Sequence, residues 1–409
     1  MIGAFEAAGI EIEYMVVNPS TLKIESRVDE LFLNMTGIDE SDEVNLGPIT
    51  LCNELCSHVL EFKCSNPEAP NENLIEEFKK AFLHVNQQLK KMDCVLLGGG
   101  MHPFLKESDP IRLWPYGQKD IYELYDKIFG CKGHGWSNVQ SIHINFPFSS
   151  EKELIHVHAA IRVVLPFIPL FAASSPIVES KHTEVLDRRL HFYEKNQARI
   201  PQISGKVIPE PISSEAEYHA LLESLYTAIS PFDPERILQE EWLNSRGAIV
   251  RFDRNAIEIR VMDTQENPIQ DVTLALFFFK LVEKVTVSYS AEKLLQLDID
   301  QLKKSFDVLH ISSDQNIELN KSLLQVFGIE KFSLSRQNLR QEIFNFVKSN
   351  LGKQTQENIN NICVHGCLAE RILQDIQLQN ILEEQAILNT YKKVQTCVES
   401  MIFFKPGTL

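Results

Sequence analysis

The sequence predicts an α+β fold, in which a part that mixes strands and helices is followed by a helical C-terminal region. Before about residue 290, segments with the two-residue alternation of strands are interspersed with segments of helical spacing. Residues 247–262 read as a β-hairpin, because both arms alternate and the turn falls near Asp253-Arg254-Asn255. Beyond residue 290 the chain is rich in Leu, Gln, Asn and Lys and has few strand signals. We therefore expect one domain over 1–290 and an α-helical C-terminal region over 291–409.

Periodicity and end signals define the individual elements. Strands are predicted at 9–17, at 52–64 (at least from Ser57 onward), at 94–97 and at 137–146. Helices are predicted at 71–92, 120–129, 154–173, 214–229, 271–289, 335–350 and 366–403. The 71–92 helix shows the pattern best, because its apolar residues recur at helical spacing and Asn71 or Asn73 can cap it. The 154–173 helix is apolar nearly all round, so we expect it to be buried.

Composition and charge narrow the class of protein. The chain has 409 residues, with 56 acidic against 40 basic side chains and a formal net charge of −16. Such an acidic chain is a poor candidate for binding nucleic acid, because that affinity comes from clustered Lys and Arg. The N-terminus has no basic segment of the signal-peptide kind, and the apolar stretch 163–178 is too short and too rich in proline to span a membrane. Eight cysteines are then expected to be reduced thiols, and the protein to be cytoplasmic without a membrane partner.

Two pairs of glutamates are the first candidate functional residues. Glu11 and Glu13 lie two apart on a predicted strand, so their carboxylates project from the same face. Two adjacent like charges repel unless a cation lies between them, and a hard cation such as Mg²⁺ prefers oxygen ligands. Glu54 and Glu61 occur in a second segment, where Glu61 is flanked by apolar neighbours. The alternative for both pairs is the solvated face of a strand.

Two further segments carry polar side chains on predicted strands. His143 shares a face with Ser141 and Asn145, although a structural histidine is an equally good interpretation. In the 247–262 hairpin Glu258 and Arg260 alternate with apolar residues, near Arg251 and Asp263. An acid that holds a cation beside an arginine that clamps phosphate suits a nucleotide–metal site. The alternative is a cross-strand ion pair, which contributes little where it is exposed. Taken together, these side chains predict one polar face that spans several strands.

Two other motifs do not support a binding site. The run 98–100 is three glycines after a strand, but no Gly-Lys-Ser/Thr follows, and no G-x-G-x-x-G is present. Cys363, His365 and Cys367 have ligand-type side chains, but zinc needs four ligands and no second pair lies nearby.

Six segments, in order over about residues 5–290, resemble the type 2 glutamate–cysteine ligases, which are carboxylate–amine ligases of the glutamine synthetase-like superfamily. The segments that carry the resemblance are Gly9-Ile-Glu11-Ile-Glu13-Tyr14, Glu54-Leu55 with Ser57-His58-Val59-Leu60-Glu61, Gly100-Met-His102-Pro103-Phe104, Gln140-Ser-Ile-His143-Ile-Asn145, Leu165-Pro166 through Ser174-Ser175-Pro176, and Ala256-Ile-Glu258-Ile-Arg260-Val-Met-Asp263-Thr264.

The resemblance implies an antiparallel sheet curved into a funnel-shaped active site, with helices packed outside. It also implies ATP-dependent amide formation through an acyl phosphate, with Mg²⁺ as the metal. By analogy with the family, the roles are as follows: Glu11, Glu13, Glu61 and Glu258 as metal ligands; Glu13 and Arg260 as catalytic; His143, Arg260 and Arg189 at the nucleotide; Glu54 and His102 at the substrate.

The expected substrates are small: a glutamate-like carboxylate and the amine of an amino acid, with cysteine as the family default. One alternative is a metal-dependent hydrolase that uses the same carboxylate face and needs no ATP. Another is a catalytically silent member of the fold, against which the retained charges argue. Assembly into a homo-oligomer is left open.

Overall fold

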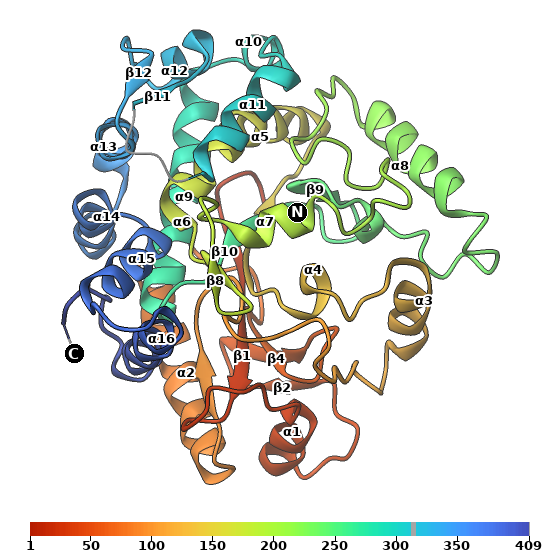
Figure 1. Cartoon of the computed structure of the whole chain (residues 1–409). Helices are drawn as coiled ribbons and strands as arrows, with labels where there is room; N and C mark the ends of the chain where they lie inside the picture. Colours follow the sequence, from red (N-terminus) through yellow and green to blue (C-terminus); the bar gives the residue numbers. More distant parts are fainter. Residues whose placement is uncertain (312–315, 409) are drawn as a thin grey trace.

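Eight strands pair into one antiparallel sheet at the centre of the molecule (Figure 1). The computed structural model describes residues 1–311 and 316–408. The order across the sheet is β2-β3-β4-β1-β6-β10-β9, and β5 pairs with the second half of β1. The strands of this sheet are β1 (Gly9–Val17), β2 (Glu43–Asn45), β3 (Ile49–Asn53), β4 (Val59–Cys64), β5 (Val95–Leu97), β6 (Ser141–Pro147), β9 (Ala248–Arg251) and β10 (Ala256–Asp263).

Helices surround the sheet, and two short hairpins lie outside it. The α-helices are α1 (Val28–Thr36), α2 (Asn73–Lys91), α3 (Lys119–Phe129), α4 (His134–Ser137), α5 (Glu151–Val164), α6 (Ile168–Ala172), α7 (Arg188–Tyr193), α8 (Glu215–Ile229), α9 (Pro268–Ser288), α10 (Ala291–Leu295), α11 (Ile299–Leu309), α12 (Lys321–Val326), α13 (Arg336–Val347), α14 (Lys353–His365), α15 (Leu368–Leu378) and α16 (Glu383–Ser400). The hairpins pair β7 (Ile177–Val178) with β8 (Lys181–His182), and β11 (Ile317–Glu318) with β12 (Ser333–Leu334).

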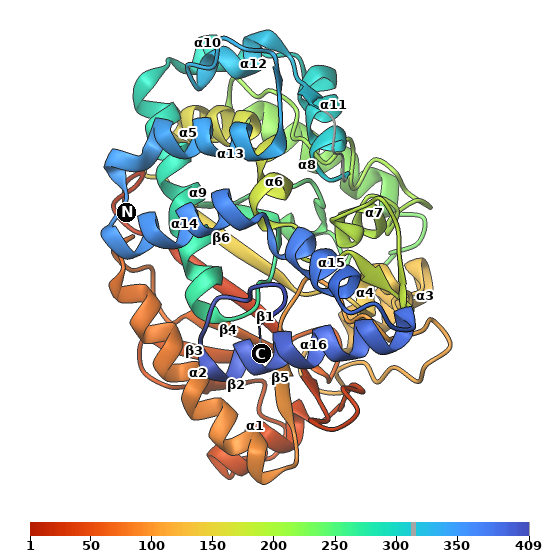
Figure 2. The ribbon, with the colours of Figure 1, turned by 60° about the vertical axis from the view of Figure 1, so that its left-hand side comes forward.

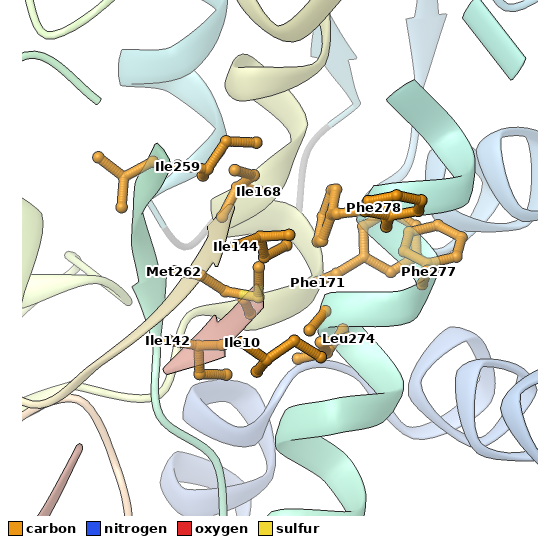
Figure 3. Close-up of a cluster of buried hydrophobic side chains, with 14 of the residues drawn as sticks. Ile10, Ile142, Ile144, Ile168, Phe171, Ile259, Met262, Leu274, Phe277 and Phe278 are labelled. Carbon is orange, nitrogen blue, oxygen red and sulfur yellow. The ribbon is translucent and has the colours of Figure 1, made fainter. Parts of the chain in front are cut away.

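One face of the sheet is apolar and forms the main core. Ile10 of β1, Ile144 of β6 and Ile259 of β10 lie on this face, and Figure 3 shows this layer together with Phe171 of α6 and Phe277 of α9. Helix α9 also packs against α2, α5 and α14, which explains why its sequence is apolar on almost every side. Because this face is covered, the polar side chains of the same strands must point to the opposite face.

The C-terminal helices pack onto the rest of the protein. Helix α14 contacts α9, and α16 contacts β5, so that the chain after residue 290 lies across α9 and the sheet (Figure 2). One cluster of buried apolar residues contains side chains from both sides of residue 290, such as Val282, Leu294 and Ile343. The predicted α+β class and the helical C-terminal region are confirmed, with the small β11–β12 hairpin as an addition. The division into two domains at residue 290 stays a prediction.

Three predicted elements differ from the observed ones in a way that the sequence explains. The predicted strand at 52–64 is two strands, because the chain turns between Asn53 and Val59. The predicted helix at 154–173 is interrupted by a 3₁₀ turn at Leu165–Phe167, where Pro166 cannot donate a backbone hydrogen bond. The predicted helix at 366–403 is two helices that are separated by residues 379–382.

Among the described residues, one helical stretch is long and apolar enough to cross a membrane. It covers Glu151–Ala172, and 89% of its apolar window is buried inside the protein. A helix at the centre of a core has the same composition, and the burial here favours that interpretation.

Candidate active site

The polar face of the sheet brings the predicted carboxylates together. Strand alternation places Glu11 and Glu13 of β1 on this face, opposite the apolar Ile10 and Ile12. In the ladder, Glu13 is paired with Glu61 of β4 and Glu11 with His143 of β6. Glu258 of β10 follows on the next strand, beside β6. Paired residues on neighbouring antiparallel strands have side chains on the same face, so four strands contribute to one surface.

This surface lines a cavity of about 480 Å³. Its lining is rich in charge of both signs and includes three aromatic rings. The carboxylates are Glu11, Glu13, Asp42, Glu43, Glu54, Glu61 and Glu258; the basic side chains are Lys63, His143, Arg251, Arg254 and Arg260; the rings are Tyr122, Tyr125 and Trp242. Seven carboxylates against four permanent cations leave the cavity acidic, which makes it an attractive environment for a further cation.

His143 lies among the carboxylates. Its Nδ1 donates to Glu11 Oε2 at 3.1 Å, and Nε2 lies 3.0 Å from the Ser141 hydroxyl, which itself donates to Glu13. Burial alone would lower the pKa of His143, but the hydrogen bond to Glu11 and the charges of Glu258, Glu13 and Glu11 raise it. The imidazole therefore lies between the carboxylates of β1. Ser141 provides the link to Glu13.

Glu11 and Glu61 differ in their partners. Burial would raise the pKa of Glu11, but the hydrogen bond and charge of His143, together with Arg254 and Lys63, lower it to about 2. Glu61 is buried, and no hydrogen bond or ion pair of its carboxylate is found in the described part of the chain. Burial and the neighbouring charge of Glu11 raise the pKa of Glu61 well above its usual range. Glu61 is thus a buried carboxylate in the cavity, and the charge of Lys63 offsets its unfavourable environment only in part.

Glu54 has a comparable environment at another part of the wall. Burial, followed by the charges of Glu13 and Glu61, raises the pKa of its carboxyl group well above the usual range. The Oε2 atom of Glu54 accepts a hydrogen bond from the backbone N–H of Leu55 at 3.3 Å. An amine or a metal ion in the cavity would relieve this repulsion.

A β-bulge positions Arg260. The register between β10 and β6 shifts between Ile259 and Met262, so that one extra residue is inserted in β10 and the strand bends there. The Arg260 guanidinium donates twice to Glu258 Oε1, at 3.0 and 2.8 Å. Glu258 also has Arg251 Nη1 at 3.6 Å. Arg260 is therefore oriented by Glu258 and points into the cavity.

Two of the predicted site residues lie outside this cavity. Arg189 is buried behind it, where Nε donates to Asp263 at 2.5 Å and Nη1 lies 3.5 Å from the carbonyl of Arg260. His102 is buried elsewhere: Nε2 donates to the Leu22 carbonyl, and Nδ1 accepts the N–H groups of Phe104 and Leu105. Arg189 can support Arg260 from behind, whereas the contacts of His102 organise a loop.

The two motifs that we set aside have structural roles. A Cβ atom at Gly98 would lie 2.2 Å from the carbonyl oxygen of Gln265, and one at Gly100 would lie 2.3 Å from the Asp263 carboxyl group. The glycines thus allow close packing against the end of β10. Cys367 is the N-cap of α15, and His365 is the last residue of α14. Both residues therefore lie at the junction of these two helices.

A second cavity of about 460 Å³ adjoins the first. It lies at the end of the sheet where β1 and β10 begin, and its wall includes Cys64, Pro67 and Pro147. Glu11, Lys63 and Arg254 line both cavities. A ligand with an extended shape could therefore occupy the two spaces at once.

The oxygen-rich donor set fits a hard cation such as Mg²⁺ better than zinc. Within residues 1–311 and 316–408, however, no three His, Cys, Asp or Glu side chains are already gathered around a common point as metal ligands. In this structure Glu11 is held by His143 and Asn145, and Glu258 by Arg260. The acidic excess and the unpaired Glu61 nevertheless favour binding of a cation.

Several lining residues were missed by the sequence reasoning. Lys63 follows Glu61 by two positions on β4, so strand alternation could have placed it on the same face. Arg254 lies in the turn of the β9–β10 hairpin, where no periodicity applies. Tyr122, Tyr125 and Trp242 come from α3 and a 3₁₀ turn, and only the tertiary packing brings them to the cavity.

Comparisons with known proteins identify the family of this chain. Residues 7–298 match the family model described as glutamate-cysteine ligase family 2. An uncharacterized protein of Archaeoglobus fulgidus is 41% identical over 272 residues, which are 65% of this chain and 73% of that protein.

Two solved structures have a similar fold. A glutamate–cysteine ligase of Francisella tularensis, solved in complex with AMP, has a TM-score of 0.60 at 14% identity, over 96% of this chain and 89% of that one. A bifunctional glutathione synthetase of Pasteurella multocida has a TM-score of 0.58 at 14% identity, over 96% of this chain and 53% of that one. The family match over most of the chain is decisive: this protein belongs to glutamate-cysteine ligase family 2, whose members are carboxylate–amine ligases.

Proposed function

We propose that the protein is an ATP- and Mg²⁺-dependent ligase that joins a glutamate-like carboxylate to the amine of an amino acid. The observation that supports this most is that one and the same cavity is lined by Glu11, Glu13, Glu61, Glu258 and Arg260. Four carboxylates beside an arginine suit a metal–phosphate centre. The AMP in the Francisella tularensis neighbour supports nucleotide binding in this fold.

The chemistry requires activation of the donor, because a carboxylate is a poor electrophile at neutral pH. A carboxylate oxygen of the donor attacks the γ-phosphorus of ATP, the bond to the β-phosphate breaks, and ADP leaves. The amine nitrogen of the acceptor then attacks the acyl carbon, the C–O bond to phosphate breaks, and the amine loses one proton. The products are an amide, ADP and inorganic phosphate.

The residues of the cavity can be assigned to these steps. Glu11, Glu13, Glu61 and Glu258 would hold Mg²⁺, which supplies positive charge against the phosphate oxygens. Arg260 would stabilise the transferring phosphoryl group, in an orientation held by Glu258. His143 would contact the nucleotide phosphates; burial would lower its pKa, but the hydrogen bond to Glu11 and the charges of Glu258, Glu13 and Glu11 raise it.

Other assignments have less support in the geometry. Glu54 lies in the wall beside Tyr122, where it can bind the ammonium group of a substrate. Arg189 would act through the backbone of Arg260 and not through the nucleotide. For His102 we propose a loop-organising role in place of the expected substrate contact. We also propose a cytoplasmic location, with small amino-acid substrates as the partners.

The test is a screen for ADP release with Mg-ATP, glutamate and a panel of amino acids and amines. We expect release that depends on both an acceptor and the divalent ion. Glu13→Gln should abolish release, because the substitution removes one of the carboxylates that we propose as metal ligands. The far-UV circular dichroism should stay unchanged. Glu107→Gln, at an exposed position away from the cavity, should behave as the wild type. Unchanged release by the Glu13→Gln variant would contradict the site, and amide hydrolysis without ATP would favour a hydrolase.

A further inference from the structure

The wall between the two cavities carries two cations that no role assigned so far explains. Arg254 and Lys63 line both the carboxylate cavity and the adjoining one, together with Glu11. Lys63 lies on β4 directly opposite Glu11 in the ladder, and Arg254 reaches the same carboxylate from the hairpin turn. The boundary between the cavities is therefore built from one acid and two bases.

The contacts of Arg254 are few. Its Nη1 lies 3.4 Å from Glu11 Oε1 and its Nε lies 3.9 Å from Asp253 Oδ2, while half of the side chain is exposed. The guanidinium is half exposed, whereas the Glu11 side chain is only 14% exposed, so Arg254 can turn to solvent while Glu11 retains other partners. Glu11 would keep its hydrogen bonds from His143 and Asn145.

Lys63 is even less engaged. None of the ion pairs within 4.0 Å between described residues involves its ammonium group; burial would lower its pKa, but a side-chain hydrogen bond with Cys52 and the charges of Glu61 and Glu11 raise it. The thiol of Cys52 is thus the side-chain neighbour of Lys63. Lys63 is thus a partly buried cation that is available to an anion at the boundary.

We propose that Arg254 and Lys63 bind the polyphosphate of a nucleotide that lies across both cavities, and that Arg254 releases Glu11 in order to do so. The inference rests on the proposed function and extends it. The base would occupy the 460 Å³ cavity and the reacting phosphate the 480 Å³ cavity. A terminal phosphate group carries more charge than a carboxylate and can accept two N–H groups of one guanidinium, whereas Glu11 accepts only one from Arg254, so a phosphate can displace Glu11 as its partner.

The exchange links nucleotide binding to the metal. While Arg254 remains beside Glu11, it competes with any cation for that carboxylate. When a phosphate takes Arg254 away, Glu11 loses one of its three side-chain partners, and its Oε1, left with Asn145 alone, would be able to accept a metal ion that arrives with the nucleotide. Arg254 therefore keeps the metal site incomplete until the nucleotide is present.

The test compares Arg254→Gln and Lys63→Met with the matched control Arg112→Gln. Arg112 is a similarly exposed arginine, and it donates to Asp29 at 2.7 Å away from both cavities. Calorimetric titration of the full-length protein with ATP should show affinity reduced about 10- to 100-fold for each wall variant, as expected for loss of a charged hydrogen bond. Affinity for adenosine, which has no phosphate, should stay unchanged, and Arg112→Gln should bind ATP as the wild type does.

A second measurement distinguishes competition between Arg254 and a metal ion for Glu11 from a simple loss of the positive charge of Arg254. Titration with Mn²⁺ in the absence of nucleotide, followed by electron paramagnetic resonance, should show tighter binding in Arg254→Gln than in the wild type. If Arg254 had only a structural role, its substitution would not strengthen the binding of Mn²⁺ and at the same time weaken the binding of ATP. Failure of Arg254→Gln to alter ATP binding, or an equal loss for ATP and adenosine, would overturn the inference. Absence of nucleotide binding by the wild type would instead contradict the proposed function itself.

Discussion

A buried ion pair joins the C-terminal helices to the end of β10. Arg371 of α15 donates to Glu266 at 2.6 and 3.2 Å, and neither side chain is exposed to solvent. Arg371 also donates to the carbonyl oxygens of Gly366 and Phe404. We predict that Arg371→Met, which keeps the apolar stem, destabilises the protein by about 3–5 kcal/mol, because it leaves a buried carboxylate without its cation.

Denaturant unfolding can test both this magnitude and the relation between the two parts of the chain. The three tryptophans, Trp114, Trp136 and Trp242, all precede residue 290, so their fluorescence reports on the part that contains the sheet. Far-UV circular dichroism reports on all helices, including those after residue 290. Because the two parts share a core, we expect both signals to shift together to lower urea concentration in Arg371→Met.

The control is Lys80→Met, which breaks an exposed ion pair with Glu77 of similar length, 2.7 Å. This variant should unfold as the wild type does, because exposed pairs contribute little. A loss below about 1 kcal/mol in Arg371→Met would refute the energetic reasoning, since a broken buried pair costs several times more. Separate fluorescence and dichroism transitions would show instead that the C-terminal helices unfold as an independent domain.

Two further predictions concern packing and pH. Gly100→Ala should lower stability by about 1–3 kcal/mol in a thermal melt, because the new Cβ would lie 2.3 Å from the Asp263 carboxyl group; Gly133→Ala, with only one atom nearby at 3.7 Å, should change little. Glu370→Gln should cost about 3 kcal/mol at pH 7, because burial is outweighed by the charges of Arg340 and Arg336, which lower the pKa of Glu370 to about 2. A lowered pKa stabilises the folded state above the unfolded-state pKa, so the difference between wild type and variant should shrink as the pH falls from 5 towards 2. A difference that stays constant over this range would contradict the assignment.

Much of the central sheet could be predicted because its strands alternate clearly. The predicted bounds of β1 agree with the structure, and those of the β9–β10 hairpin agree closely. Apolar residues on one face and charged ones on the other have a period of two, which depends only on local sequence. The short helices α1, α4 and α7 were missed, because four to nine residues contain too little periodicity to separate a helix from a loop.

The candidate site shows the same limit in another form. Glu11, Glu13, Glu61, His143 and Glu258 could be grouped, because each lies on a strand and strand alternation determines its face. Alternation does not say which strands are neighbours; the order β4-β1-β6-β10 is seen only in the structure. Arg254 reaches the site from a turn, and Tyr122, which lines the cavity together with Glu54, comes from α3. Side chains such as these enter the cavity through tertiary packing alone.

The acidity of the cavity connects stability with binding. Burial and mutual repulsion raise the pKa values of Glu54 and Glu61, which means that the folded protein keeps these carboxylates in an unfavourable environment. The apolar layer on the opposite face of the sheet provides the stability that makes this arrangement possible. A cation that binds the folded state alone removes part of the repulsion and shifts the folding equilibrium towards the folded state. The same carboxylates that weaken the protein without ligand therefore favour the binding of a metal ion and, through it, of a nucleotide.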